Sequence, residues 1–223
     1  MPLVFDHAFI CCDRAAPEAD ALVASGLVEG SRNVHEGQGT ANRRFFFAGG
    51  YLEFVWVEDE LEARSPLTAP TRLHERWAGR HGATCPIGIG FCPAGEDVPD
   101  PPFPTWPYQP KYLPPDQPIL FAKDTSLEEP ELFCLPWPRR PGASTEPTLH
   151  PAGLDRLVSV SVGMPGGRTL SQASRRAQAA GLLGFHRSAR HELVVTFRAR
   201  SACTFDLRPG LPLVLHGTEG GAW

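Results

Sequence analysis

The feature that most constrains the fold of this chain is a proline-dense stretch near its middle. Between residues 97 and 118 nine prolines alternate with large aromatic side chains. Proline lacks the backbone N–H that a helix or a central strand requires, so this stretch can form neither of them. We expect an ordered extended loop, which either packs over the domain or forms the wall of a ligand pocket. In the second case Trp106, Tyr108 and Tyr112 would contact the ligand.

The chain before this stretch has the pattern of a βαβββ module. Apolar and β-branched runs predict four strands, and Gly49-Gly50 is a hairpin dipeptide between the last two. After the first strand, Asp13 is a suitable N-cap and Gly26 a suitable end for a helix over about 15–25. Residues 1–60 are therefore predicted to form the first module. Its strands are expected at residues 4–12, 27–35, 43–48 and 51–57.

The C-terminal third repeats this order of elements. A strand at 154–163 precedes an Ala/Arg-rich helix at 171–180 that ends at Gly181, and further strands follow. A duplicated module explains this order economically, so residues 151–223 are predicted to form a second βαβββ module. The intervening residues 61–150 are predicted to hold a helix at 71–80, extra strands at 85–92, 119–122 and 131–135, the proline-rich insert and a linker.

Composition and charge exclude several classes of partner. The net charge of -4 and the pI of about 6.1 give no reason to expect binding to nucleic acid or to an anionic membrane. The N-terminus lacks the basic and long apolar regions of a secretory signal, and no segment is long and apolar enough to span a bilayer. Six cysteines without a C-x-x-C pair predict neither a zinc signature nor a disulfide framework. We therefore expect a cytoplasmic protein with mostly buried thiols.

The strongest functional signal lies between residues 35 and 56. It begins with a polar, glycine-punctuated turn, His35-Glu36-Gly37-Gln38-Gly39-Thr40-Ala41-Asn42, and ends with Glu53 as a lone carboxylate among large apolar residues. Together with Phe5-Asp6-His7-Ala8-Phe9-Ile10, this segment resembles the first module of the glyoxalase-like branch of the vicinal oxygen chelate (VOC) superfamily. The resemblance is specific over residues 4–58, looser over 154–216 and absent from the proline-rich insert.

This resemblance implies an α+β fold in which two βαβββ modules form a curled mixed sheet, or cup, around a small-molecule site. It also implies ligands for a divalent ion on the first and last strands of each module. His7 and Glu53 occupy the matching places in the first module, and His35 precedes Gly-Thr-x-Asn as in the family signature. Imidazole and carboxylate groups suit Zn, Fe, Mn, Ni or Co, so the expected metal ligands are His7, Glu53 and His35.

The second module departs from the family pattern, because the position that corresponds to His7 is Arg156. An arginine cannot ligate a cation and would repel a metal placed next to it. Two expectations therefore stay open. One is a metal site shifted toward His7, His35 and Glu53. The other is a metal-free pocket in which Arg156 pairs with Glu53, Asp206 or a substrate carboxylate. The candidate catalytic residues are Glu53, His35 and Arg156.

The preferred hypothesis is an enzyme that acts on a small organic molecule by lyase, isomerase or dioxygenase chemistry. One alternative is a non-catalytic small-molecule binding protein, and another is a metal-free enzyme that uses Glu53 and Arg156. VOC modules often share sheets between chains, so a homodimer is also open. Arg43 and Arg44 alternate across a strand, and only one can face a pocket. The predicted substrate-binding residues are Asn42, Arg44, Trp56, Trp106, Tyr108 and Tyr112.

Overall fold

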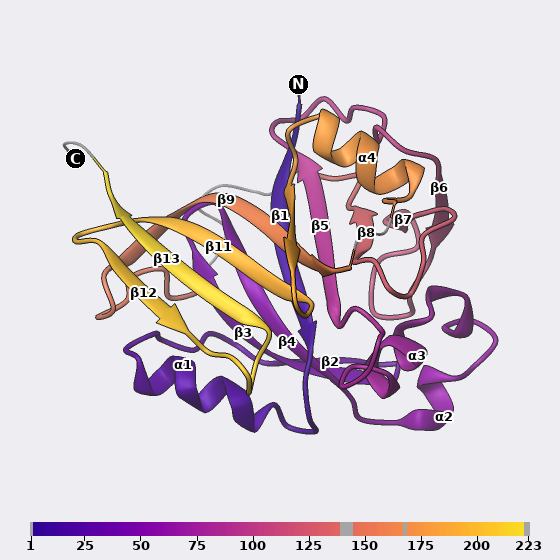
Figure 1. Ribbon diagram of the computed structural model, residues 1–223. Helices are drawn as coiled ribbons and strands as arrows, with labels where there is room; N and C mark the ends of the chain where they lie inside the picture. The colour runs from indigo at the N-terminus through magenta and orange to yellow at the C-terminus, as the bar shows by residue number, and fades with distance from the viewer. Residues whose placement is uncertain (1, 139–144, 167–168, 221–223) are drawn as a thin grey trace.

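The structure is a computed structural model that describes residues 2–138, 145–166 and 169–220. Its first eight strands are β1 (Leu3–Cys11), β2 (Asn33–His35), β3 (Thr40–Phe47), β4 (Gly50–Val57), β5 (Ile87–Pro93), β6 (Thr105–Tyr108), β7 (Ile119–Ala122) and β8 (Glu131–Cys134). They form one sheet in the order β2-β3-β4-β1-β5-β8-β7-β6 (Figure 1). The strands predicted at 4–12, 43–48, 51–57 and 85–92 are present, because their apolar side chains are buried by this sheet. The strand predicted at 27–35 forms only over its last three residues, and the first two of these are exposed.

Short helices connect these strands. A 3-10 turn (Pro17–Ala19) and α1 (Asp20–Ala24) follow β1, while α2 (Glu60–Ala63), a second 3-10 turn (Ala69–Thr71) and α3 (Leu73–Ala78) lie between β4 and β5. The side chain of Asp59 caps α2 by accepting hydrogen bonds from two backbone N–H groups of the first turn. In the described part of the chain, no helix has the length and apolar character that crossing a bilayer would require.

The large sheet contains the same pairing pattern twice. In the first half β1 is parallel to β4, and β3 is antiparallel to both β4 and β2. In the second half β5 is parallel to β8, and β7 is antiparallel to both β8 and β6. The antiparallel pair of β1 and β5 joins the two halves. Where the first half has α1 after its first strand, the second half has the proline-rich stretch.

This arrangement differs from the predicted one at the second module. The strands that extend the first module into a larger sheet come from residues 87–134 rather than from 151–223. The proline-rich stretch also contributes a strand, β6, which was not predicted. Pro107 is compatible with β6 because this strand lies at the edge of the sheet, where a missing N–H costs no ladder bond on the open side.

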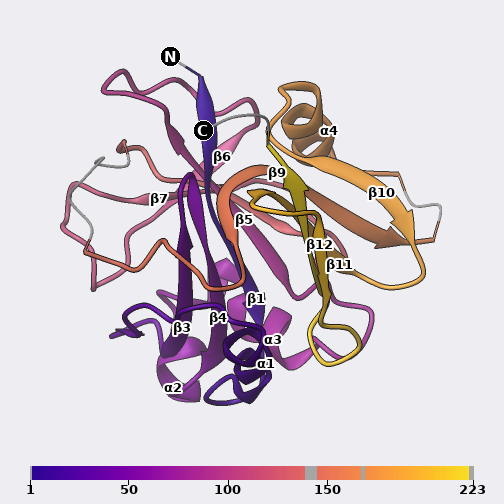
Figure 2. The same cartoon turned by 90° about the vertical axis from the view of Figure 1, so that its left-hand side faces the viewer.

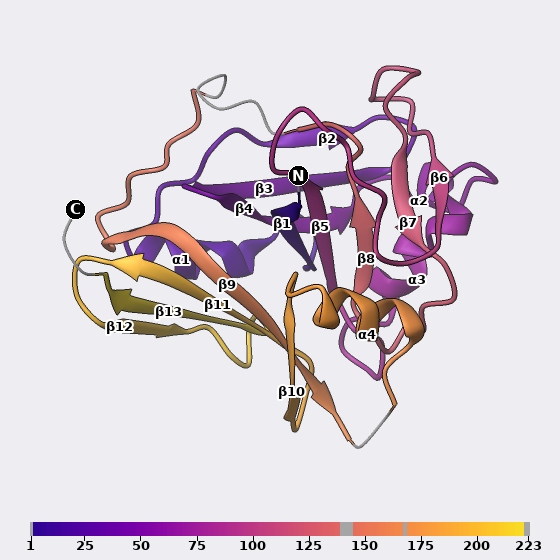
Figure 3. The same ribbon diagram turned by 90° about the horizontal axis from the view of Figure 1, so that it is seen from above.

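Residues after 153 form a second sheet. Its elements are β9 (Leu154–Pro165), α4 (Gln172–Ala179), β10 (Gly184–Ser188), β11 (Glu192–Ala199), β12 (Cys203–Asp206) and β13 (Leu213–Glu219). The strand order is β10-β9-β11-β13-β12, and Figures 2 and 3 show this sheet lying against the first half of the large one. Backbone hydrogen bonds between Ala48, at the end of β3, and β9 join the two sheets.

The main hydrophobic core lies between the two sheets. Side chains of β1 and β4 divide between the two faces of the large sheet, as strand geometry requires. Ile10 and Phe54 belong to the main core with Val162, Leu193 and Phe197 of the second sheet. The opposite face carries a smaller apolar cluster of Phe9, Cys11, Val55, Tyr108, Ile119, Phe121 and Phe133. That second face also carries the polar residues described next.

Candidate functional site

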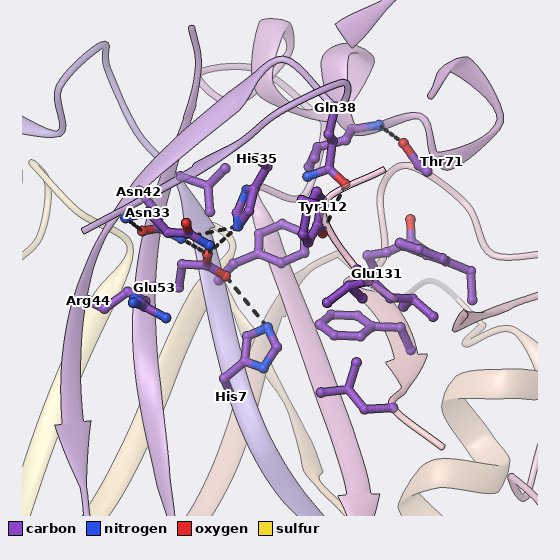
Figure 4. Close-up of a pocket in the computed structure, with 18 of the residues that line it drawn as sticks. His7, Asn33, His35, Gln38, Asn42, Arg44, Glu53, Thr71, Tyr112 and Glu131 are labelled. Carbon is purple, nitrogen blue, oxygen red and sulfur yellow. Dashed lines mark hydrogen bonds and ion pairs between the residues drawn. The ribbon is translucent and has the colours of Figure 1, made fainter. Parts of the chain in front are cut away.

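A cavity of about 340 Å³ lies on the face of the large sheet that points away from the main core. Its volume is within the range of about 300–1,000 Å³ that is usual for small-molecule sites. The wall formed by β1–β4 is mostly polar, and Figure 4 shows its labelled side chains grouped together. This polar side consists of His7, Asn33, His35, Gln38, Asn42, Arg44 and Glu53. The opposite, mostly apolar side includes Leu73, Leu113, Ile119, Phe121, Phe133, Leu135 and Trp137.

His7 on β1 is held by a buried carboxylate. The register of β1 against β5 shifts between Phe5 and His7, which leaves Asp6 as the extra residue of a β-bulge. Asp6 Oδ2 lies 2.6 Å from His7 Nδ1, and a carboxylate can only accept here, so Nδ1 carries a proton. The ring also stacks on Tyr51, with 4.5 Å between centroids. These contacts fix the imidazole so that Nε2 faces the cavity and Glu53.

Glu53 on β4 lies between two imidazoles. Its Oε2 is 3.5 Å from His7 Nε2, and its Oε1 is 3.7 Å from His35 Nε2. Asn42 on β3 donates a hydrogen bond from Nδ2 to Oε1 of Glu53. The backbone N–H of Asn33 donates to Asn42 Oδ1 at 2.8 Å, so the backbone fixes which end of the amide faces Glu53.

His35, at the end of β2, is a neutral base. Its Nε2 is 3.4 Å from Asn42 Nδ2, which can only donate, so Nε2 accepts and Nδ1 donates to Thr40 Oγ1 at 2.9 Å. Burial lowers the pKa of His35 below its ordinary value of 6.5. Tyr112 from the proline-rich stretch covers the ring, with 4.6 Å between centroids, and donates to Gln38 Oε1 at 3.3 Å. Because burial also raises the pKa of Tyr112, its hydroxyl keeps its proton.

The structure brings six of the predicted site residues into the wall of this one cavity: His7, His35, Asn42, Arg44, Glu53 and Tyr112. Strand alternation separates the two neighbouring arginines as predicted. Arg44 faces the cavity, whereas Arg43 is buried on the other side of β3 and pairs with Glu29 and Asp20.

Two predicted residues lie away from the cavity because of strand geometry. Arg156 is exposed on β9, in the second sheet, and Ala48 is its bridge partner. It would have reached the cavity only if residues 151–223 had completed the large sheet. Trp56 points to the opposite face of β4 from Glu53, where it joins the main core and its indole donates to Glu58 at 2.7 Å.

Two further residues predicted to bind substrate, Trp106 and Tyr108 on β6, also lie outside the cavity lining. Trp106 stacks on Phe121 with 5.4 Å between centroids, and Tyr108 meets the same ring edge-on at 5.8 Å. Both therefore support the apolar wall from behind, because Phe121 itself lines the cavity. Of the aromatic residues predicted in the proline-rich stretch, Tyr112 reaches the cavity.

Sequence reasoning missed a second carboxylate in the cavity wall. Glu131, at the start of β8, is buried and accepts a hydrogen bond at 3.2 Å from Arg76, whose side chain is 1% exposed. Burial raises the pKa of Glu131, while the charge of Arg76 opposes this effect. The sequence did contain a signal for this residue, because a charged side chain begins the apolar strand Glu131-Leu132-Phe133-Cys134. Glu53 is likewise a charged residue within an apolar strand.

The polar side offers suitable donor atoms for a transition metal. Imidazole nitrogens and a carboxylate are donor types that such ions prefer, and Asp6 behind His7 is the kind of partner that orients a histidine ligand. In residues 2–138, 145–166 and 169–220, however, no group of three or more His, Cys, Asp or Glu side chains is arranged to hold a metal ion. Asn42 Nδ2 instead contacts both His35 and Glu53.

Comparison with solved structures finds chains that resemble this one in part. A hypothetical protein from Staphylococcus aureus has a TM-score of 0.50 and 10% identity, with 98% of this chain and 100% of that chain covered. A triple mutant of 4-hydroxymandelate synthase from Streptomyces coelicolor has a TM-score of 0.40 and 14% identity, with 98% of this chain and 62% of that chain covered. At 10% identity the similarity to the Staphylococcus aureus protein concerns the fold alone. No curated protein matches the sequence.

A family model for a glyoxalase-like domain matches residues 5–85. This range contains β1 to β4, which carry His7, His35, Asn42, Arg44 and Glu53. The match confirms the resemblance inferred from the sequence motifs, and it covers the whole polar side of the cavity. Residues 5–85 of this chain are therefore similar to a glyoxalase-like domain.

Proposed function

We propose that the protein is a VOC-like enzyme that moves a proton on a small organic molecule bound in the cavity. The observation that carries this proposal is the position of Glu53, whose two carboxylate oxygens lie 3.5 and 3.7 Å from the Nε2 atoms of His7 and His35. Three groups that can accept a proton thus face one space beside an apolar wall. Acid–base catalysis needs such groups within hydrogen-bond reach of the substrate, in a site that excludes most water.

Each of these groups has a fixed orientation, which is the second support for the proposal. Asn42 directs the Glu53 carboxylate, Asp6 directs His7, and Thr40 directs His35. The lowered pKa of His35 keeps its ring unprotonated at neutral pH, as a base requires. Proton transfer at carbon is common to lyases and isomerases, so we place the reaction in these two classes.

A divalent metal is implied by the family resemblance, and His7, His35 and Glu53 are the residues that would hold it. When bound, such an ion would act as a Lewis acid on the oxygen atoms of the substrate. The tasks proposed for these side chains belong to the site without the ion, because an Nε2 atom bound to a metal has no lone pair left to accept a proton. Glu53 and His35 accept and return the proton, and the apolar wall keeps water away.

A non-catalytic binding protein is the second candidate, and the aromatic lining favours it. The rings of Tyr51, Tyr112 and Phe133 line the cavity and could stack on a flat ligand. This candidate predicts saturable binding without chemical change. A metal-free enzyme is a third candidate, but its cation would be Arg44 or Arg76 rather than Arg156, because only the first two line the cavity.

Solvent exchange tests the proposal without knowledge of the product. The protein is incubated in D₂O with a panel of small hydroxy- and oxo-carbonyl compounds, and NMR follows deuterium incorporation at carbon. We expect exchange into at least one compound and a loss of about 100-fold or more in Glu53→Gln. His81→Gln is the control, because His81 is an exposed histidine outside this cavity. Binding without exchange for every compound would favour the binding protein.

Elemental analysis tests the metal separately. The protein is purified without a metal-chelating tag and compared with a His7→Ala, Glu53→Ala double mutant. Near-stoichiometric transition metal that disappears in the mutant would establish that these residues hold it. Equal metal content in the two proteins would contradict the assignment of these ligands.

A further inference from the structure

Arg44 supplies a positive charge to the polar side of the cavity. It lies on β3 directly opposite Glu53 of β4 in the strand register. Figure 4 shows its guanidinium nitrogens pointing toward the space occupied by Glu53 and His7. The side chain is 20% exposed, so it is neither free in solvent nor sealed inside the core.

The protein holds one edge of this guanidinium and leaves another donor unused. Arg44 Nε donates to the Ser31 carbonyl at 2.9 Å, and Nη2 donates to Ser31 Oγ at 2.5 Å. The guanidinium carbon also lies 5.1 Å from the centroid of the Phe46 ring. Within the described ranges, Nη1 has no hydrogen-bond partner. A rigid, permanently charged donor of this kind is suited to bind a carboxylate.

Among the described residues, Glu146 is the acidic side chain within ion-pair distance of Arg44, and it does not use that donor. Glu146 Oε1 is 3.8 Å from Nη2, which is a loose ion pair, and the Glu146 carboxylate accepts hydrogen bonds from Ser31 instead. Glu146 therefore holds the Ser31 loop and, through it, the orientation of Arg44. On the cavity side, no described acidic side chain lies within ion-pair distance of the guanidinium, and the nearest in the strand register is Glu53.

The second arginine of the cavity differs from Arg44 because its charge is already paired. Arg76 Nη1 donates to the carbonyls of Cys85 and Glu129, and Nη2 donates to Glu131. Its charge is compensated by the Glu131 carboxylate inside the wall. Among the described residues that line the cavity, Arg44 is thus the cation that remains available to an anionic ligand.

The apolar side of the cavity defines the rest of the ligand. Rings and branched side chains face the polar side across the cavity, and they offer no charge to a ligand except at the Arg76–Glu131 pair. A ligand that bridges both sides must therefore carry an anionic group next to an apolar body. The lining residues on this side include Leu113, Ile119, Phe121, Phe133 and Leu135.

We propose that the substrates of this cavity are organic carboxylates with an apolar, ring-sized body, and that Arg44 anchors the carboxylate. This inference rests on the proposed function in taking the cavity as the substrate site, and it adds the substrate class. A carboxylate on Arg44 places its neighbouring carbon next to Glu53, because the two residues face each other across β3 and β4. Arg44 would therefore select the substrate and direct the reacting carbon toward the base.

Isothermal titration calorimetry with three probes of the same shape tests this inference. The probes are phenylacetate, its neutral amide phenylacetamide, and the cation phenethylamine. We expect the wild-type protein to bind phenylacetate about tenfold or more tightly than phenylacetamide, and phenethylamine more weakly still. In Arg44→Gln the acid and the amide should bind equally, whereas Arg44→Lys should keep part of the preference. Arg14→Gln is the matched control, since it removes an arginine that is 67% exposed and also pairs with a glutamate.

The inference is overturned if the wild-type protein does not bind phenylacetate at millimolar concentration, or if it binds the amide as tightly. It is also overturned if Arg44→Gln keeps the full preference for the acid. The wild-type comparison decides the matter even if a variant fails to fold. Equal binding together with intact deuterium exchange would refute the Arg44 anchor alone. A clear preference for the acid without any exchange would refute the proposed catalysis alone.

Discussion

At the scale of single residues, Asn42 organises the polar side of the cavity through its amide. It donates to Glu53, lies beside His35 and accepts from the backbone of Asn33. Asn42→Asp would replace the donor with a second carboxylate next to Glu53. We expect a loss of about 1–3 kcal/mol in the free energy of unfolding at pH 7, because a buried hydrogen bond becomes a like-charge contact. Urea unfolding measures this loss.

Asn33→Asp provides the control for that substitution. Asn33 is the register partner of Asn42, but its side chain is exposed and its Oδ1 accepts a hydrogen bond from Val34, which aspartate can also accept. Replacing the amide of Asn33 with a carboxylate should therefore change the free energy of unfolding little. Equal losses in the two variants would show that the amide of Asn42 has no special role.

His150 predicts how stability depends on pH. It is buried, accepts from the Val28 N–H at 3.0 Å and donates to the Phe46 carbonyl at 2.8 Å. Burial lowers the pKa of His150 below its ordinary value of 6.5. The unfolded chain therefore binds a proton at a higher pH than the folded chain does, and stability is lost as pH falls below about 6.5. His150→Gln should make the free energy of unfolding less dependent on pH between 7 and 5, which urea unfolding at several pH values would measure.

At the scale of elements, β5 makes room for the cavity through its glycines. A Cβ on Gly88 would lie 2.0 Å from a ring carbon of Phe9, and a Cβ on Gly90 would lie 2.5 Å from one of Phe133. Both rings line the cavity, so they can lie close to the sheet only over bare backbone. We expect Gly88→Ala to lower the free energy of unfolding by about 1–3 kcal/mol and to push Phe9 into the cavity.

Thermal unfolding and binding of phenylacetate would measure these two effects of Gly88→Ala. Gly184→Ala on β10 is the matched control, because its nearest neighbour would be at an ordinary contact distance of 3.4 Å. Unchanged stability and unchanged binding in Gly88→Ala would contradict the proposed packing of Phe9.

The elements that could be predicted from sequence are those specified by local patterns. Strands β1, β3 and β4 follow apolar runs, and α3 and α4 lie within the helices predicted at 71–80 and 171–180. The first helix is shorter than predicted, because Pro17 and the positive φ of Ala16 delay its start until Asp20. Strand β6 was missed because its proline argues against a strand unless the strand is known to lie at an edge.

At the scale of the whole molecule, the two sheets share one core. Phe197 of β11 is fully buried and packs against Phe47 of β3, with 4.5 Å between centroids. We therefore expect Phe197→Ala to lower the free energy of unfolding by about 3–5 kcal/mol and to destabilise both sheets together. Tryptophan fluorescence would follow unfolding of the large sheet. Four of the five tryptophans belong to the N-terminal part of the chain, which forms that sheet: Trp56, Trp77, Trp106 and Trp137. An unchanged unfolding midpoint would mean that the sheets unfold independently.

The pairing of strands far apart in sequence is what the sequence could not reveal. His35 and Glu53 were identified because each is a local exception, a polar group in or beside an apolar run. Arg156 was assigned to the site because it matches His7 in element order, but element order does not specify which strands complete a sheet. Residues 87–134 and 151–223 both supply suitable strands, and only their packing decides that β5 pairs with β1.

The repeated pairing pattern of the large sheet separates two tasks in space. Strands β1 to β4 carry the groups proposed to handle protons and the carboxylate, whereas β7, β8 and the segments next to them shape most of the apolar wall. Substitutions that enlarge or narrow that wall can therefore accumulate without disturbing Glu53 and its neighbours. Such a molecule can be retuned for new ligands during evolution while its chemistry is inherited unchanged.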